Sequence, residues 1–253
     1  MININLVNKH LQFPQVSLKE PLESGFMLIA AEVDSKTSFW GESSTKKNLL
    51  KELKLLQTQL INHENVIEIA LFKASLFPPI HRQDNDYLIK AKRNQIIHDH
   101  YDIVILIEMS SVKAIQDLKS NEDYLKITHA IIESSSYHFI YQAKNLKRID
   151  SVNHQKGGVF LFNFFVAENA EQNLGIWEYT AGWFEDQTNL DNSTLFGSID
   201  PESSAYSVIN HCRWNGFINV LPSLILKKTF KTYVLENFAA NNVSAIPILY
   251  RLA

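Results

Sequence analysis

The order of predicted strands and helices repeats once along the chain, and this repeat constrains the fold more than any other feature of the sequence. In the first half, short apolar runs predict four strands, bounded by glycine, proline or polar residues. A stretch with leucines on one stripe and lysines opposite predicts an amphipathic helix after the first strand. A broken helical region, whose second helix should start with Ser120 as its N-cap, precedes the fourth strand. The predicted strands are 26–33, 66–77, 101–108 and 137–144, and the helices are 45–62 and a broken region that ends near 133.

The same order returns in the second half, which begins at the glycine pair Gly157-Gly158. Its last helical region starts after Trp214 and contains Pro222. Proline is costly inside a helix but is accepted in the first turn of a new one, so Pro222 predicts a break at that point. The predicted strands are 159–168, 193–200, 205–212 and 243–251, and the first helix is 173–187.

Two βαββαβ units in one chain predict an α+β fold, in which tandem ferredoxin-like repeats form an intramolecular dimeric α/β barrel. The helices of such a unit cover one face of its antiparallel sheet, and the other face stays apolar until it packs against a second sheet. The expected division is a lead-in at 1–24, a first repeat at 25–150 and a second repeat at 151–253. We expect a monomer, closed by its internal pseudo-dimer, or a homodimer.

Composition narrows the classes of partner. The 253 residues are 45% hydrophobic and carry a formal net charge of −3, which is typical of a globular chain with no long-range attraction to nucleic acid or anionic lipid. We therefore expect neither nucleic acid nor a membrane as a partner. Cys212 is the only cysteine, so no internal disulfide or cysteine-rich metal site is possible, and no metal is expected. The absence of a secretory-type apolar segment at the N-terminus favours a cytoplasmic protein.

Two stretches resemble known families. Residues 206–253, with Trp214 at the end of a strand and the motif PILY at 247–250, resemble the C-terminal half of antibiotic-biosynthesis-monooxygenase domains. Residues 101–131 are similar to the corresponding half of stress-responsive dimeric α/β barrel domains. The resemblance implies a small-molecule pocket between the sheet and the helices of one repeat. Members of this superfamily include cofactor-independent monooxygenases, heme-degrading enzymes and proteins without known chemistry.

The resemblance also points to particular residues. Heme degraders of this fold use an Asn on the first strand, a Trp after the third strand and a His on the last helix. Asn163 and Trp214 match the first two positions in the second repeat, and His129 matches the third position in the first repeat. Neither repeat holds the full set, which argues against heme degradation.

Further candidates come from the residues themselves. His211 and Arg213 lie two apart on a strand and so share one side, where the pair could bind a carboxylate or an enolate. His129 could serve as a pocket base or lie on a helix surface. The aromatic side chains of Phe160, Phe162 and Trp177 would contact an apolar substrate.

The leading hypothesis is an antibiotic-biosynthesis-monooxygenase-like oxidoreductase that acts on an aromatic or planar apolar small molecule without a bound cofactor. Asn163, Trp214, His211 and His129 are its predicted catalytic residues, and Arg213, Phe160, Phe162 and Trp177 its predicted substrate contacts. The first alternative is a non-catalytic barrel that binds a ligand or serves a stress-related role. The second is a heme-binding or heme-degrading protein like the chlorite dismutases, which also fuse two such units.

Overall fold

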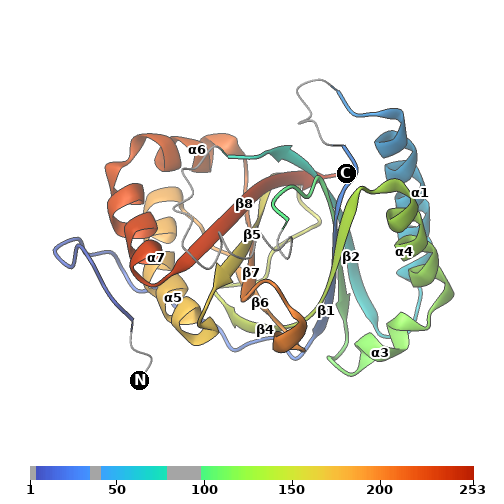
Figure 1. Ribbon diagram of the computed structural model, residues 1–253, viewed down its shortest axis with the longest axis horizontal. Helices are drawn as coiled ribbons and strands as arrows, with labels where there is room; N and C mark the ends of the chain where they lie inside the picture. Colours follow the sequence, from blue (N-terminus) through green and yellow to red (C-terminus); the bar gives the residue numbers. More distant parts are fainter. Residues whose placement is uncertain (1–3, 35–40, 79–97) are drawn as a thin grey trace.

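A closed barrel of antiparallel strands forms the centre of the molecule, with helices packed on its outside (Figure 1). The computed structural model describes residues 4–34, 41–78 and 98–253. The strand order around the barrel is β1-β3-β2-β8-β5-β7-β6-β4. The strands are β1 (Gly25–Glu32), β2 (Val66–Leu76), β3 (Ile103–Met109), β4 (Tyr137–Arg148), β5 (Val159–Ala167), β6 (Thr194–Ser198), β7 (Val208–Trp214) and β8 (Val243–Leu252).

Each half of the chain contributes four neighbouring strands, and the two four-stranded sheets have equivalent orders. The order β4-β1-β3-β2 in the first half corresponds to β8-β5-β7-β6 in the second. The halves join where β2 pairs with β8 and where β4 pairs with β6, so neither sheet keeps a free edge. The predicted tandem ferredoxin-like fold is thereby confirmed, whereas the domain limits at 24/25 and 150/151 stay predictions.

Helices cover the outer face of each sheet on opposite sides of the barrel (Figure 1). The outward side of β4, at His138 and Ile140, is exposed, but most strands have the barrel interior on one side and this helical layer on the other, so both of their faces are buried. On β5, for example, Phe160 and Phe162 face the interior, while Leu161 and Phe165 face the helices. The helices are α1 (Ser44–Leu60), α3 (Ala114–Lys119) and α4 (Glu122–Ser134) in the first half, and α5 (Ala170–Thr188), α6 (Phe217–Leu226), the π-helical turn η3 (Phe230–Leu235) and α7 (Glu236–Ala240) in the second, with a short 3-10 turn at Pro201–Ser203.

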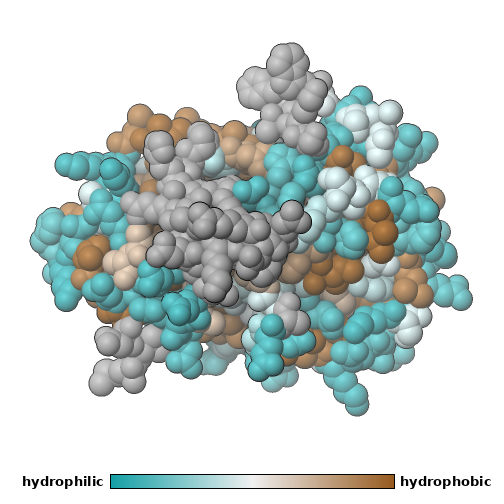
Figure 2. Space-filling view, viewed as in Figure 1, coloured by the Kyte–Doolittle hydropathy of each residue, from teal (hydrophilic) through white to brown (hydrophobic). Residues whose placement is uncertain are grey.

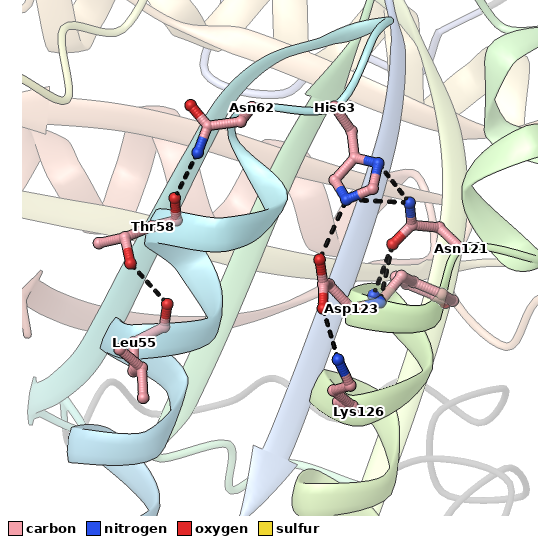
Figure 3. A network of polar contacts seen from close by, with 8 residues as sticks. Leu55, Thr58, Asn62, His63, Asn121, Asp123 and Lys126 are labelled. Carbon is pink, nitrogen blue, oxygen red and sulfur yellow. Dashed lines mark hydrogen bonds and ion pairs between the residues drawn. The ribbon is translucent and has the colours of Figure 1, made fainter.

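The N-cap of α4 differs from the sequence-based expectation. Asn121, not Ser120, caps this helix: its Oδ1 accepts hydrogen bonds from the backbone N–H groups of Asp123 and Tyr124 at 2.9 and 3.1 Å (Figure 3). Ser120 instead ends α3. The Asn121 amide also contacts His63, which pairs with Asp123 at 3.0 Å, so the start of α4 is fixed to the loop after α1.

The predicted break at Pro222 is also wrong. Pro222 lies inside α6, which continues to Leu226, and the chain leaves the helix at Lys227. The proline ring removes one intrahelical hydrogen bond but does not end the helix, because Val220 and Ser223 on either side are buried against the rest of the second half. In the described residues, no helix combines the length and the apolar character needed to cross a bilayer.

Candidate functional site

A cavity lies in the second half, between the outer face of its sheet and the helices α5, α6 and α7. The centre of a water molecule can occupy about 90 Å³ of it. Since one water needs roughly 10–15 Å³ by this measure, the cavity can hold several waters or a small ligand. Most of the wall is aliphatic or aromatic, with Trp177 and Phe184 from α5, Leu224 from α6 and Trp214 from the end of β7.

Asn163 supplies an acceptor to this cavity that the described protein does not use. It lies on β5 directly opposite Asn210 on β7, and both side chains line the cavity. Asn210 Oδ1 accepts a hydrogen bond from Ser193 Oγ at 2.6 Å. Asn163 Oδ1, in contrast, is buried without a hydrogen-bond partner among the described residues. A buried acceptor in this state costs free energy, so a ligand that donates a hydrogen bond would bind favourably there.

Trp214 offers the cavity only its ring. Its Nε1–H donates to Thr188 Oγ1 at 2.9 Å, and the Thr188 hydroxyl donates to the Phe184 carbonyl at 2.5 Å. This chain fixes the indole against the C-terminal end of α5. With its polar atom already bonded, Trp214 acts as a flat apolar wall, and Trp177 contributes a second aromatic surface.

Acid–base groups are scarce on the cavity wall. Among the described lining residues, Cys212 is the only one with a titratable side chain. Burial raises the pKa of the Cys212 thiol well above its ordinary value, so the thiol stays protonated and is a poor nucleophile. The described wall therefore holds no side chain suited to take up a proton that a ligand loses in this cavity.

The wall does not suit a heme. Heme iron needs an axial ligand such as His, Cys, Met or Tyr, and of these the described lining residues include Cys212 alone. Its raised pKa disfavours the thiolate that iron would require. The predicted heme alternative therefore finds no ligand in the described part of this cavity.

His211 lies on the opposite side of the sheet from the cavity. Its ring is fully buried in the barrel interior and stacks on Phe162, with 4.0 Å between the ring centroids. Its Nδ1 donates to the Leu161 carbonyl at 3.0 Å, and its Nε2 lies 2.9 Å from Nε2 of His154. His154 in turn contacts Glu68 Oε2 through Nδ1 at 2.6 Å.

Four other predicted site residues also lie away from the cavity. Arg213 shares the face of His211, and its guanidinium donates to the Gly157 carbonyl near the start of β5. Phe160 and Phe162 belong to the barrel interior. His129 is on the surface of α4, with a side chain 71% exposed and 3.4 Å from Glu133. The structure thus brings Asn163, Trp177 and Trp214 together, but not the other five predicted residues.

Sequence reasoning missed Asn210, Ser193 and His154. For Asn210 a signal existed: it is four residues before Trp214 on one strand, so the two share a face, whereas His211 is three before it and cannot. No local pattern identifies Ser193 or His154, because their partners lie far away in the chain. In the described residues, no group of three His, Cys, Asp or Glu side chains is placed to hold a metal ion.

Comparisons with known proteins add evidence about the fold. No family model matches the sequence, and no curated protein matches it. Among solved structures, an anthrone oxidase-like protein aligns with a TM-score of 0.62, at 9% identity, over 91% of this chain and 92% of its own. A candidate monooxygenase from Fusobacterium nucleatum aligns with a TM-score of 0.55, at 10% identity, over 91% and 92%. The chain has the dimeric α/β barrel fold, with both repeats in one polypeptide.

The alignments span both repeats of the dimeric α/β barrel, so the likeness concerns the whole architecture and not one half. A mutant chlorite dismutase from Candidatus Nitrospira defluvii also aligns, with a TM-score of 0.48 at 9% identity over 93% of this chain and 92% of its own. That likeness is too weak to bear on heme binding. At 9–10% identity, these similarities show the fold, and a shared fold does not determine an activity.

Proposed function

We propose that the second-half cavity binds a planar, mainly apolar small molecule and promotes its oxidation by molecular oxygen without a bound cofactor. The observation that carries this proposal is Asn163 Oδ1, a buried acceptor without a partner among the described residues, on a mainly apolar wall. A substrate hydroxyl would donate to this oxygen, and the rings of Trp177 and Trp214 would contact the substrate's flat faces.

A cavity of this kind suits a substrate whose C–H bond is acidic enough to lose a proton without a strong base on the cavity wall. A hydroxyanthrone has a methylene between two aryl rings, and loss of one of its protons gives a delocalised carbanion. The carbanion passes one electron to oxygen, the two radicals combine to a peroxide, and water leaves. Overall, the CH₂ group and O₂ become a ketone and H₂O. The cavity would supply orientation and a dry environment, since its described wall holds no general base. The anthrone oxidase-like neighbour supports the choice of this substrate class.

The test measures oxygen uptake with a hydroxyanthrone and with unsubstituted anthrone, each corrected for spontaneous oxidation. We expect Asn163→Ala to lower kcat/KM for the hydroxyanthrone about tenfold, which corresponds to the loss of one hydrogen bond worth about 1.4 kcal/mol in the transition state. The same variant should change the rate with unsubstituted anthrone less than about twofold, because that substrate has no hydroxyl to donate.

A matched control is His129→Ala, which changes a side chain exposed on α4 in the other half. It should leave both rates unchanged. Equal losses for the two substrates in Asn163→Ala, or equal losses in His129→Ala, would count against the assigned site.

The scarcity of ionisable groups on the wall favours a second candidate function, a binding barrel without catalysis. In that case a hydroxyanthrone would quench the fluorescence of Trp177 and Trp214 on binding, and Asn163→Ala would weaken binding. Oxygen uptake would stay at the spontaneous rate in all variants. Measuring quenching and oxygen uptake on the same samples separates the two functions.

A further inference from the structure

Helix α6 exposes an apolar outer face. Ile218, Ile225 and Leu226 are 81%, 74% and 78% exposed, whereas Val220 and Leu224 on the inner side line the cavity. In Figure 2 the outer face is visible as a brown area over α6 at the upper left. A helix that is apolar on both sides is normally buried on both sides, so the outer side of α6 is suited to contact something apolar.

Positive charge follows this apolar face directly. Lys227 and Lys228 come immediately after Leu226, and Lys231 is one turn further on; all three are exposed. The sequence contains no aspartate or glutamate between Trp214 and Glu236, although the whole chain has a net charge of −3. The local charge of this segment is therefore opposite in sign to that of the protein as a whole.

The size of the apolar face argues against a second copy of the chain as its partner. Burial of an aliphatic side chain removes about 60–120 Å² of apolar surface from water, so three such side chains at this exposure offer roughly 150–300 Å². A stable protein–protein interface needs about 800 Å² from each partner. A lipid surface has no such threshold, because each side chain enters the headgroup region by itself.

We propose that this α6 surface, made of Ile218, Ile225, Leu226, Lys228 and Lys231, docks on an anionic lipid bilayer. The three aliphatic side chains would enter the boundary between headgroups and acyl chains, and the lysines would remain among the lipid phosphates. The net charge of the whole chain predicts no membrane partner. The exposed apolar face of α6 and the lysines that follow it are the local features that depart from this prediction. The contact is peripheral, and it does not depend on the chemistry of the cavity.

The first test is flotation of the full chain with vesicles of phosphatidylcholine alone and of phosphatidylcholine mixed with phosphatidylglycerol. We expect binding to the anionic vesicles only, weakened by salt. The double variant Ile225→Ser/Leu226→Ser should abolish flotation. The double variant Lys228→Glu/Lys231→Glu should weaken it on the order of tenfold or more. Lys227 is left unchanged because its Nζ bonds to the Gln187 carbonyl.

Matched controls come from α1, which carries an exposed leucine just after two exposed lysines in the other half of the molecule. Leu55 is 62% exposed, and Lys51 and Lys54 are exposed as well. Leu55→Ser and Lys51→Glu/Lys54→Glu should leave flotation unchanged. Thermal unfolding of each variant shows whether it is folded. Equal losses from the α1 and α6 variants would overturn the proposal, as would absence of flotation by the wild type.

A second measurement separates insertion from simple attraction. Cys212 is the only native cysteine and is buried, so an environment-sensitive fluorophore attached to an Ile225→Cys variant labels α6 alone. Its emission should shift to the blue with anionic vesicles and stay unchanged with phosphatidylcholine. If the wild type instead forms a dimer in solution that Ile225→Ser/Leu226→Ser dissociates, the partner is a second copy and the lipid proposal is wrong.

Discussion

Asn163 is a polar residue in a strand whose neighbours, from Val159 to Ala167, are apolar. An unpartnered buried acceptor costs about 1–3 kcal/mol, and leucine has nearly the shape of asparagine without that cost. We expect Asn163→Leu to raise the free energy of unfolding by about 1 kcal/mol, as measured by chemical denaturation. The same variant should lose binding of a hydroxyanthrone. A variant that is less stable than the wild type would show that the Asn163 amide has a structural partner.

Asp102, unlike Asn163, is a buried polar residue whose side chain has both an ion-pair partner and hydrogen-bond donors. Its carboxylate pairs with Lys46 Nζ at 2.9 Å, and both side chains are at most 4% exposed. It also accepts hydrogen bonds from the backbone N–H groups of Val33 and Asp34. Asp102→Ala should lower the free energy of unfolding by about 3–5 kcal/mol, because it leaves the Lys46 ammonium buried and unpaired.

The control for Asp102 is Asp150→Ala. The Asp150 carboxylate pairs with Lys19, but these side chains are 45% and 53% exposed, so solvent screens the pair. Asp150→Ala should therefore lower the free energy of unfolding by no more than about 1 kcal/mol. Similar losses in both variants would mean that burial does not govern the strength of these pairs.

How far the site could be predicted depends on the strand β7. The alternation along it correctly separates His211 and Arg213 from Asn210 and Cys212. It cannot say which side faces the cavity, because the strand is buried on both faces. The alternation does show that His211 and Trp214, three residues apart, cannot share a pocket.

Asn163 and Trp214 could be predicted from the family resemblance. The hydrogen bond between His154 and His211, in contrast, spans a loop and has no local pattern in the sequence.

At the scale of single elements, the start of α4 gives a direct test of capping. Asn121 accepts from two backbone N–H groups, while Ser120 Oγ donates to the Asp117 carbonyl at the end of α3. Asn121→Ala should lower the free energy of unfolding by about 1–2 kcal/mol, and Ser120→Ala by less than about 0.5 kcal/mol. Thermal or chemical denaturation measures both. The reverse order would restore Ser120 as the cap.

The two helix errors have one cause. Ser120 and Pro222 are local signals that compete with nearby alternatives, and tertiary contacts decide between them. Asn121 caps α4 in place of Ser120 because its amide also contacts His63 across the loop. Helix α6 continues through Pro222 because Val220 and Ser223 on either side of it are buried. The existence of each helix could be predicted from periodicity, whereas its ends depended on residues distant in sequence.

At the scale of the whole molecule, the repeat in the sequence was enough to predict a closed barrel, since two half-covered sheets can bury their apolar faces only against each other. It did not predict the polar contacts that cross between the halves. Glu68 belongs to β2 in the first half, His154 to the segment between the halves, and His211 to β7 in the second half. These three side chains form a continuous hydrogen-bonded chain at the junction.

This series of hydrogen bonds makes the stability of the junction dependent on pH. Burial, together with the electrostatic interaction with His154, lowers the pKa of His211 well below its ordinary value, so His211 stays neutral in the folded protein. In the unfolded chain it titrates near its ordinary value of about 6.5. As the pH falls below about 6.5, the unfolded state takes up a proton that the folded state excludes, and stability decreases. Burial raises the pKa of Glu68, but its hydrogen bond and charge interaction with His154 outweigh this and lower it overall, which adds a further loss below about pH 4.5.

The variant His211→Phe tests this dependence. Its ring can keep the stack on Phe162, but it cannot take up a proton in the unfolded state. Between about pH 6.5 and pH 5 the wild type should lose up to about 1.4 kcal/mol of stability per pH unit more than this variant. Chemical denaturation at a series of pH values gives both slopes, and His129→Ala, which changes an exposed histidine, should keep the wild-type slope. Parallel curves for wild type and His211→Phe would mean that His211 takes up a proton in the folded barrel as readily as in the unfolded chain.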